Sequence, residues 1–343
     1  MSTMNGVRLP GGSRVEHATL PVPEPGPGQV LLGMRASSIC GSDIRAIYRE
    51  HLGHGAEAYR GVVAGHEPCG EVVATGPGVG LSVGDRVVVY HIVGCGLCDE
   101  CRLGYEIGCT SPARAAYGWQ RDGGHADFLL AEERSCLLLP HALSFVDGAL
   151  VSCGFGTAWE ALLRINVSGQ DGLLVTGLGP VGLAAAMLGR ALGATPVVGV
   201  DLSPSRRALA LSLGVVDDAL EPSEDVLHLT HGAGFSATVD CSGAAEARAL
   251  AVRSTSRWGR CAFVGEGGSV TLDVSQELIH RQVSLHGSWV TSVPHMRSLL
   301  ARLDQWDLHP EEIVSHRLPL ADAAAAYDVA DRGGDGKVVI VWE

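Results

Sequence analysis

Four cysteines within one short segment are the clearest chemical signal in the chain. Cys95, Cys98, Cys101 and Cys109 are separated by two, two and seven residues. Four thiolates at such short spacings can form a tetrahedral shell around one Zn²⁺ ion. Free thiols and an iron–sulfur site are the alternatives, but this spacing fits neither ferredoxin pattern. Because a shell of four thiolates has no open position, we predict that this zinc ion is structural.

A second set of metal-ligand types is scattered along the chain. Cys40 precedes Gly-Ser-Asp, His66 lies within Gly-His-Glu, and Cys153 precedes Gly-Phe-Gly-Thr. Two thiolates and one imidazole leave a fourth position open for water or substrate, as in catalytic zinc sites. Spacing alone leaves another interpretation open, since a lone histidine after a glycine is commonly a turn or core residue.

A glycine-rich segment indicates a dinucleotide site. It follows a short apolar stretch, 173–176, and opens a helix-like stretch; its residues are Gly177, Leu178, Gly179, Pro180, Val181 and Gly182. In such a motif the glycines make the tight turn, admit the pyrophosphate and pack the helix on the strand. Asp201 ends the next apolar stretch and would bind the adenine ribose hydroxyls, which favours NAD over NADP.

Two further residues belong to this predicted cofactor site. The nearby Arg206 could instead tolerate a 2′-phosphate, and Val264 ends a later strand of the same domain. A glycine turn in a nucleotide-free α/β domain is the alternative interpretation of the whole segment.

The elements that must position these residues change in character near residue 155. Residues 1 to about 150 combine period-2 alternation, as at 30–36, with many glycine and proline turns, which is typical of a small β-barrel. From about 155 short apolar strands (173–176, 197–200, 238–241, 260–264, 283–285) alternate with helical stretches (157–163, 181–192, 205–213), which predicts a doubly wound parallel sheet. Two helices (295–305, 321–330) and a strand (337–341) follow and should return to the first domain.

Composition excludes several classes of function. The 343 residues are long enough for two domains, and the formal charge of −13 opposes binding to nucleic acid or to an anionic membrane. We expect no signal peptide, no membrane span and a cytoplasmic location. In a reducing compartment the ten cysteines favour metal ligation over disulfides. Four of them, in apolar settings, are expected to be buried thiols: Cys69, Cys136, Cys241 and Cys261.

These motifs, in this order, resemble those of the zinc-dependent medium-chain alcohol/polyol dehydrogenase family, and the resemblance covers essentially the whole chain. It implies an α/β protein with a GroES-like β-barrel catalytic domain (1–153 and 289–343), a doubly wound Rossmann NAD-binding domain (154–288) and an active site in the cleft between them. It also implies one catalytic and one structural Zn²⁺ per chain, with Cys40, His66 and Cys153 holding the catalytic ion.

The resemblance assigns further roles close to the catalytic zinc. Glu67 would be a close neighbour and occasional ligand, Ser42 would take the alcohol proton, and Thr157 would lie near the nicotinamide. Asp43 would orient His66 through its other ring nitrogen, with a simple turn cap as an equal alternative.

The sequence also departs from the family pattern. Many relatives carry a relay histidine where this chain has Arg45, which cannot act as a base at neutral pH. His51, His54 or water would have to end the relay. Polyol dehydrogenases often have glutamate as third zinc ligand, whereas Cys153 resembles the alcohol dehydrogenase version. Polar and aromatic side chains that could line the substrate pocket, or simply pack, are His91, Tyr48, Tyr117, Trp119 and Trp289.

We therefore expect an oxidoreductase that transfers hydride between NAD(H) and an alcohol/ketone pair, with a secondary alcohol, polyol or sugar-like substrate. The alternatives are a biosynthetic carbonyl reductase of the same family and a non-catalytic NAD-binding protein that keeps only the structural zinc. The chain has no room for the large insertions of dimeric relatives, so a homotetramer is favoured over a dimer.

Overall fold

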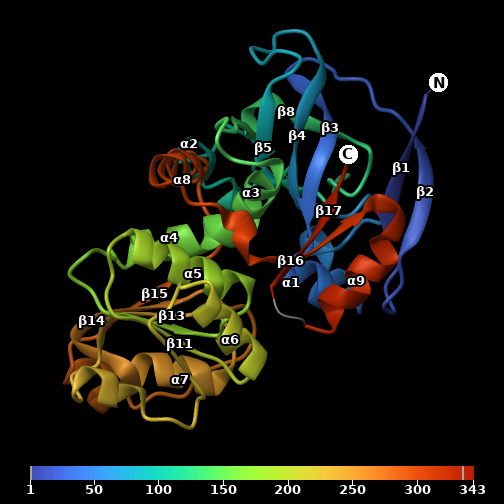
Figure 1. Ribbon diagram of the computed structural model, residues 1–343. Coiled ribbons are helices and arrows are strands. Elements are labelled where there is room, and N and C mark those ends of the chain that lie inside the picture. Colours follow the sequence, from blue (N-terminus) through green and yellow to red (C-terminus); the bar gives the residue numbers. More distant parts are fainter. Residues whose placement is uncertain (1, 334–335) are drawn as a thin grey trace. The chain divides into compact units, whose positions relative to one another are not determined.

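A computed structural model of the protein describes residues 2–333 and 336–343. The chain forms two compact units (Figure 1). Unit 1 comprises Met1–Gly156 and Thr291–Glu343, and unit 2 comprises Thr157–Val290. The expected domain boundaries, at 153/154 and 288/289, lie two or three residues from these. The C-terminal tail belongs with the N-terminal part of the chain.

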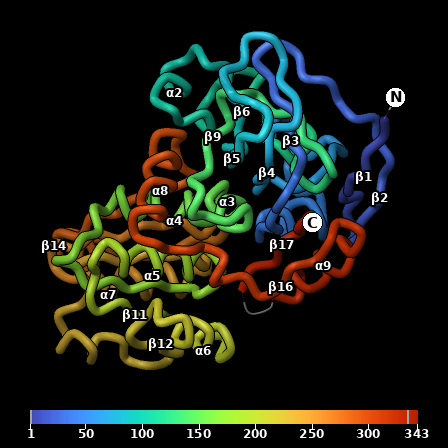
Figure 2. Tube along the Cα trace, turned by 45° about the horizontal axis from the view of Figure 1, so that its top comes forward, coloured from blue at the N-terminus to red at the C-terminus, as the bar shows by residue number. Residues whose placement is uncertain are grey.

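Unit 1 is built on a mixed sheet. Within its described residues this sheet has seven strands, in the order β16-β17-β3-β4-β5-β9, with β8 paired to β3. The strands are β3 Gln29–Ser38, β4 Glu67–Thr75, β5 Arg86–Val89, β8 Phe128–Glu132, β9 Cys136–Leu138, β16 Val314–Pro319 and β17 Lys337–Val341. Figure 2 shows β17, from the end of the chain, beside β3 from its beginning. The smaller strands are β1 Thr3–Arg8, β2 Glu16–Pro21, β6 Ile92–Val93 and β7 Ala115–Ala116.

Short helices connect the strands of unit 1. The α-helices are α1 Gly41–Asp43, α2 Asp99–Arg102, α3 Phe145–Leu150, α8 Val293–Trp306 and α9 Ala323–Asp331. π-Helical turns follow α1 (η1, Ile44–Tyr48) and α3 (η5, Val151–Phe155), and 3₁₀ turns lie at η2 Gly55–Glu57, η3 Glu106–Gly108, η4 Glu133–Ser135, η8 Pro310–Ile313 and η9 Leu320–Asp322. Alternating side chains of β3, such as Val30 and Leu32, are fully buried against Val87, Val89 and Leu129.

Unit 2, all of whose residues are described, is the predicted parallel sheet. Its six strands run in the order β12-β11-β10-β13-β14-β15, and every pair is parallel. The strands are β10 Leu173–Thr176, β11 Val197–Val200, β12 Asp218–Leu220, β13 Phe235–Asp240, β14 Thr255–Phe263 and β15 Ser284–Gly287. This order reverses direction at β10, where the glycine-rich segment begins, and a ligand site is expected at such a switch point.

Helices cover both faces of the parallel sheet. Figure 1 shows α5 on one face and α7 on the other. The helical segments are α4 Gly156–Arg164, which begins at the last residue of unit 1, α5 Pro180–Ala191, α6 Pro204–Ser212, η6 Val226–Thr230, α7 Ala245–Ser254 and the π-helical η7 Val274–Ile279. Helix α5 is almost wholly buried along 182–189, because alanine, glycine and leucine let it pack tightly on the strands.

Some local expectations need correction. Helix α7 and strand β12 were not predicted from the sequence. Of the four cysteines expected to be buried, Cys69 and Cys261 are fully buried, but Cys136 and Cys241 are partly exposed. Every helix in the described part of the chain is too short or too polar to cross a lipid bilayer.

Candidate functional site

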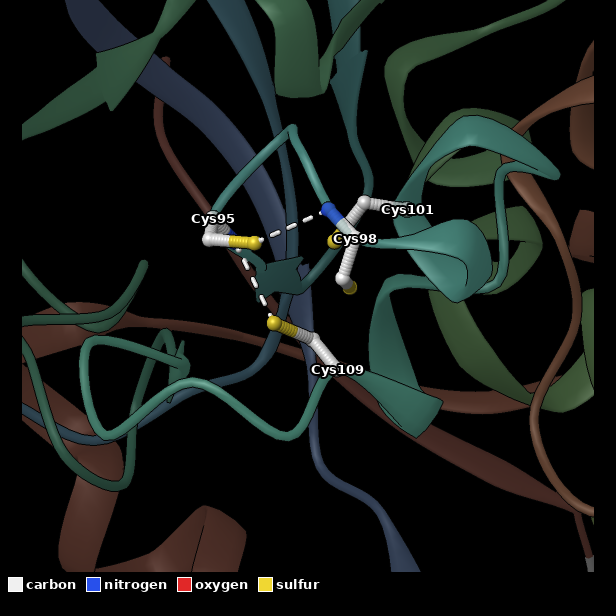
Figure 3. Close-up of side chains that lie close together, drawn as sticks. All are labelled: Cys95, Cys98, Cys101 and Cys109. Carbon is white, nitrogen blue, oxygen red and sulfur yellow. Dashed lines mark hydrogen bonds between the residues drawn. The ribbon is translucent and has the colours of Figure 1, made fainter.

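The four-cysteine segment folds into a compact metal-binding geometry. Cys98 precedes α2, Cys101 lies within it, and Cys109 follows η3. The four sulfur atoms lie within 4.8 Å of one another, and Figure 3 shows the side chains converging on one point. Because tetrahedral thiolate coordination is what zinc prefers, these residues fit a closed zinc shell.

Backbone donors stabilise negative charge on these sulfurs. The amides of Leu97 and Cys98 both donate to Cys95 Sγ at 3.4 Å, and the Cys95 amide donates to Cys109 Sγ at 3.3 Å. The two amide donors lower the pKa of Cys95 to about 6. A thiol held as thiolate near neutral pH is ready to bind metal.

The second ligand set assembles where β3 and β4 meet. In this antiparallel pair Ser38, at the end of β3, lies opposite Glu67, at the start of β4. Cys40 and His66, just beyond these ends, are therefore brought together. Cys153 arrives from η5, and donor atoms of Cys40, His66, Glu67 and Cys153 lie within 4.8 Å of one another.

Burial and hydrogen bonding prepare this second cluster for a cation. His66 is only 2% exposed and Glu67 is fully buried, whereas Cys40 and Cys153 are partly exposed. A hydrogen bond between the two thiols lowers the pKa of Cys40 well below its ordinary value and raises that of Cys153. One soft anionic donor, a second thiol, an imidazole and a carboxylate make a donor set that suits zinc.

Glycine is required immediately before His66. Gly65 has a φ of +89°, and a Cβ there would lie 2.4 Å from Cδ2 of the buried His125. Only glycine combines this backbone conformation with such a close approach. The turn at Gly65 places His66 immediately before the start of β4.

Asp43 both orients His66 and caps the turn that follows Cys40, the two roles considered for it from the sequence. Its Oδ1 lies 2.8 Å from Nδ1 of His66, and its Oδ2 accepts a hydrogen bond from the Cys40 amide at 2.9 Å. The side chain is fully buried. Asp43 thus holds two residues of the cluster at once and leaves Nε2 of His66 as the nitrogen that can bind a metal.

Two residues that sequence reasoning missed contact Glu67. Lys337 Nζ lies 2.6 Å from Glu67 Oε2, and the Ser38 hydroxyl donates to the same oxygen. Both Lys337 and Glu67 are buried. A lysine opening the otherwise apolar strand Lys-Val-Val-Ile-Val is the only signal that the sequence offered.

Ser42 lies in α1, two residues after Cys40 and directly before Asp43, and is partly exposed. Arg45, in the position of the relay histidine, is exposed, as is His54. His51 is held by the N-terminal segment, because its Nε2 lies 2.9 Å from the Leu9 carbonyl oxygen.

The five candidate pocket residues divide into distinct groups. The rings of His91 and Trp119 lie 5.2 and 5.7 Å from that of His66, and Trp119 is stacked parallel to it. Tyr48 packs instead in a core cluster against Tyr327, and Tyr117 is buried with its hydroxyl on Glu132. These two tyrosines pack in the core of unit 1, which is the second of the two possibilities that the sequence left open. Trp289 is a half-exposed residue of unit 2.

His91 presents one defined ring nitrogen. Its Nδ1 lies 2.8 Å from the Ser152 carbonyl oxygen, which can only accept, so Nδ1 carries the proton. Burial lowers the pKa of His91 to about 4, with the neighbouring His66 acting in the same direction. The neutral ring therefore offers Nε2 as a hydrogen-bond acceptor.

The glycine segment of unit 2 has the geometry that a dinucleotide requires. Gly177 adopts a φ of +89°, and a Cβ on Gly182 would lie 1.8 Å from the Gly177 carbonyl oxygen. A Cβ on Gly179, by contrast, would meet only an Arg206 nitrogen at 3.9 Å, so this side of the turn is open to a ligand. Pro180 begins α5, whose N-terminal amides face the same turn, as anion binding requires.

Asp201 and its neighbours complete this site. Asp201 accepts hydrogen bonds from the amides of Leu178 at 2.7 Å and Ser203 at 2.8 Å, and the Arg206 guanidinium lies 3.8 Å from its carboxylate. A carboxylate has further lone pairs for ribose hydroxyls. Val264, which directly follows β14, is buried, and its amide donates a hydrogen bond to the Asp240 carbonyl oxygen.

Comparisons with known proteins agree with this architecture. Residues 26–141 match the alcohol dehydrogenase GroES-like domain, and residues 180–305 match the zinc-binding dehydrogenase domain. The chain is 49% identical, over 99% of both chains, to the uncharacterized zinc-type alcohol dehydrogenase-like protein YphC of Escherichia coli strain K12. It is 31% identical, over 96% of both, to L-threonine 3-dehydrogenase of Pyrococcus horikoshii.

A solved structure shares the fold along the whole chain. It is described as a zinc-binding dehydrogenase from Sinorhizobium meliloti 1021 bound to NADP, and matches with a TM-score of 0.88 and 25% identity over 100% of both chains. The chain therefore belongs to the zinc-dependent medium-chain alcohol dehydrogenase family, and its two units are the GroES-like and Rossmann-type domains of that family.

Proposed function

We propose that this protein is an NAD(H)-dependent alcohol dehydrogenase that interconverts a polar secondary alcohol and its ketone. The observation that carries the proposal is the convergence of the Cys40, His66 and Cys153 donor atoms, with Ser42 two residues after Cys40, in a chain that also carries a complete dinucleotide turn. The L-threonine 3-dehydrogenase relatives support a secondary alcohol, because the hydroxyl of threonine is one.

In this proposal Cys40, His66 and Cys153 hold a catalytic zinc ion, and the four-cysteine segment holds a structural one. Zinc supplies Lewis acidity, which lowers the pKa of a bound hydroxyl, and NAD⁺ accepts the hydride. The surrounding residues do the rest. Ser42 takes the alcohol proton, Asp43 fixes the His66 tautomer, and Thr157, at the start of unit 2, contacts the nicotinamide.

The polar character of the substrate is inferred from His91 and Trp119. The neutral His91 offers an acceptor nitrogen close to His66, and Trp119 provides an aromatic surface beside the same ring. An acceptor so placed favours a substrate that carries a second donor, such as a hydroxyl or an ammonium group. Polyols, sugars and amino alcohols fit this description better than simple aliphatic alcohols.

Asp201 supports NAD(H) as the cofactor. Its carboxylate would accept hydrogen bonds from the ribose hydroxyls and repel a 2′-phosphate. Arg206 is the counter-argument, since it lies 3.8 Å from Asp201 and the Sinorhizobium meliloti relative binds NADP. Measuring kcat/KM with both cofactors tests the proposal, and a higher value with NADP⁺ would contradict it.

The decisive experiment is an NAD⁺-coupled screen over polyols, sugars, amino alcohols including L-threonine, and simple secondary alcohols. Two zinc ions per chain by metal analysis, together with turnover of a polar secondary alcohol, would support the proposal. One zinc ion and no turnover would favour a non-catalytic NAD-binding protein. Turnover confined to the ketone and NADH would favour a reductase.

We also propose that the protein forms an oligomer, with a tetramer favoured, and that it is located in the cytoplasm. Strand β15 lies at the edge of the six-stranded sheet, and Trp258, Ile279 and Leu285 are exposed in the same unit. An edge strand and exposed apolar side chains favour association. All ten cysteines are free, which fits a reducing compartment. Light scattering on the purified protein tests the tetramer.

A further inference from the structure

The two oxygens of the Glu67 carboxylate differ in their hydrogen-bond partners. Its Oε2 receives Lys337 Nζ at 2.6 Å and the Ser38 hydroxyl, whereas its Oε1 is buried and has no hydrogen-bond partner among the described residues. A buried polar atom without a partner requires an explanation. Here the neighbours of Glu67 are the donor atoms of Cys40, His66 and Cys153, all within 4.8 Å.

The fold brings Lys337 to this place from the far end of the chain. Strand β17 pairs with β3, so that Val339 lies opposite Ser38, and β3 in turn pairs Ser38 with Glu67. Lys337 opens β17 and reaches Glu67 across the end of β3. Its side chain is 4% exposed and forms an ion pair with the Glu67 carboxylate. A buried lysine is retained only where an opposite charge compensates it.

We propose that Lys337, aided by Ser38, is a positioning residue that holds Glu67 back from the catalytic metal and so keeps the fourth coordination position open to substrate. This rests on the proposed zinc site. The buried carboxylate of Glu67 can be satisfied in two ways, by Lys337 or by a metal ion held at Cys40, His66 and Cys153. While Lys337 holds Oε2, ligation by Glu67 must compete with a buried ion pair. Without the lysine, Glu67 becomes a fourth ligand and the shell closes as in a structural site.

The test uses the binding of imidazole to the cobalt-substituted protein, without cofactor or substrate. Imidazole binds only to a metal with an open position, and cobalt d–d absorption reports the change. The four-cysteine site is saturated and does not respond. We expect Lys337→Met to weaken imidazole binding by about 10- to 100-fold, the range typical of residues that support metal ligands.

Two further variants separate this role from a general loss of structure. Lys337→Arg keeps the charge and should bind imidazole within about threefold of the wild type, while the double variant Lys337→Met/Glu67→Gln should recover most of the loss, because a neutral amide is a poor metal ligand. Ser38→Ala removes only one donor from Oε2 and should weaken imidazole binding in the same direction. It also serves as the test if Lys337→Met does not fold.

The outcomes distinguish this inference from the proposed function. If wild-type protein takes up cobalt only at the four-cysteine site, the catalytic metal site itself is wrong. If the wild type binds imidazole and Lys337→Met, or Ser38→Ala in its place, binds it equally well, the positioning role of Lys337 is wrong. Failure of Glu67→Gln to restore binding in the double variant would also overturn it.

Discussion

Replacing Asp43 with asparagine should weaken metal binding without disrupting the fold. Asp43 uses one oxygen for Nδ1 of His66 and the other for the Cys40 amide. An asparagine can accept only one of these bonds, and its single carbonyl oxygen is needed by the Cys40 amide. Its NH₂ group then faces Nδ1 of His66 and forces the ring proton onto Nε2, the nitrogen that should bind zinc.

The expected magnitude follows from this forced tautomer. Residues that orient a metal-ligating histidine typically contribute about 10- to 100-fold in metal affinity, or about 1.4–2.8 kcal/mol. We expect Asp43→Asn to lose zinc from the Cys40, His66 and Cys153 site to a competing chelator at correspondingly lower chelator concentration. Zinc in the four-cysteine site should be retained, so total zinc should fall from two ions to one.

The chain contains a matched control for this variant. Asp147 is also fully buried, accepts a helix-capping amide (Ser144, 2.9 Å) and pairs with a histidine Nδ1 (His309, 3.0 Å), but lies in neither metal cluster. Asp147→Asn should therefore lower thermal stability and leave zinc affinity unchanged. If Asp43→Asn keeps both zinc ions at wild-type affinity, or if Asp147→Asn loses zinc equally, the reasoning about the His66 tautomer is refuted.

The remaining predictions concern the proton path, the cofactor, the structural metal and pH. Ser42→Ala should lower kcat by about 10²–10⁴-fold with zinc content and NAD affinity unchanged; wild-type turnover would mean that the proton leaves by another route. Asp201→Asn should raise the ratio of kcat/KM for NADP⁺ over NAD⁺ by at least about tenfold, and an unchanged ratio would exclude a contact with the ribose. Cys101→Ser should release one zinc ion and expose the 94–109 segment to proteolysis, whereas Cys136→Ser, outside the cluster, should do neither. The hydrogen bond to a buried aspartate raises the pKa of His309, so its stabilising effect is complete below about pH 6.5 and lost as pH rises through the higher folded value. His309→Gln should accordingly lower Tm more at pH 5.5 than at pH 9, and an equal loss at both values would contradict a charged pair.

Local spacing determined much of this protein from the sequence alone. The four-cysteine segment and the glycine turn are each contained in a short stretch, so their geometry depends on few neighbours, and residue type and spacing suffice to predict them. The strands at 173–176, 197–200 and 337–341 were predicted with the bounds that the structure has, because short apolar runs between turn residues leave little freedom.

Only the tertiary structure decided the surroundings of the second metal cluster. Lys337 meets Glu67 because β17 is inserted beside β3, a long-range pairing to which no local pattern points. The packing of Tyr48 and Tyr117 could not be predicted for the same reason. The sequence does not show whether an aromatic residue near a ligand motif faces a binding site or the core. Asp43 could be assigned both its roles only once Cys40 and His66 were in place on either side of it. Which side chains share a buried volume depends on strand order and register, and these are set by the packing of the whole domain.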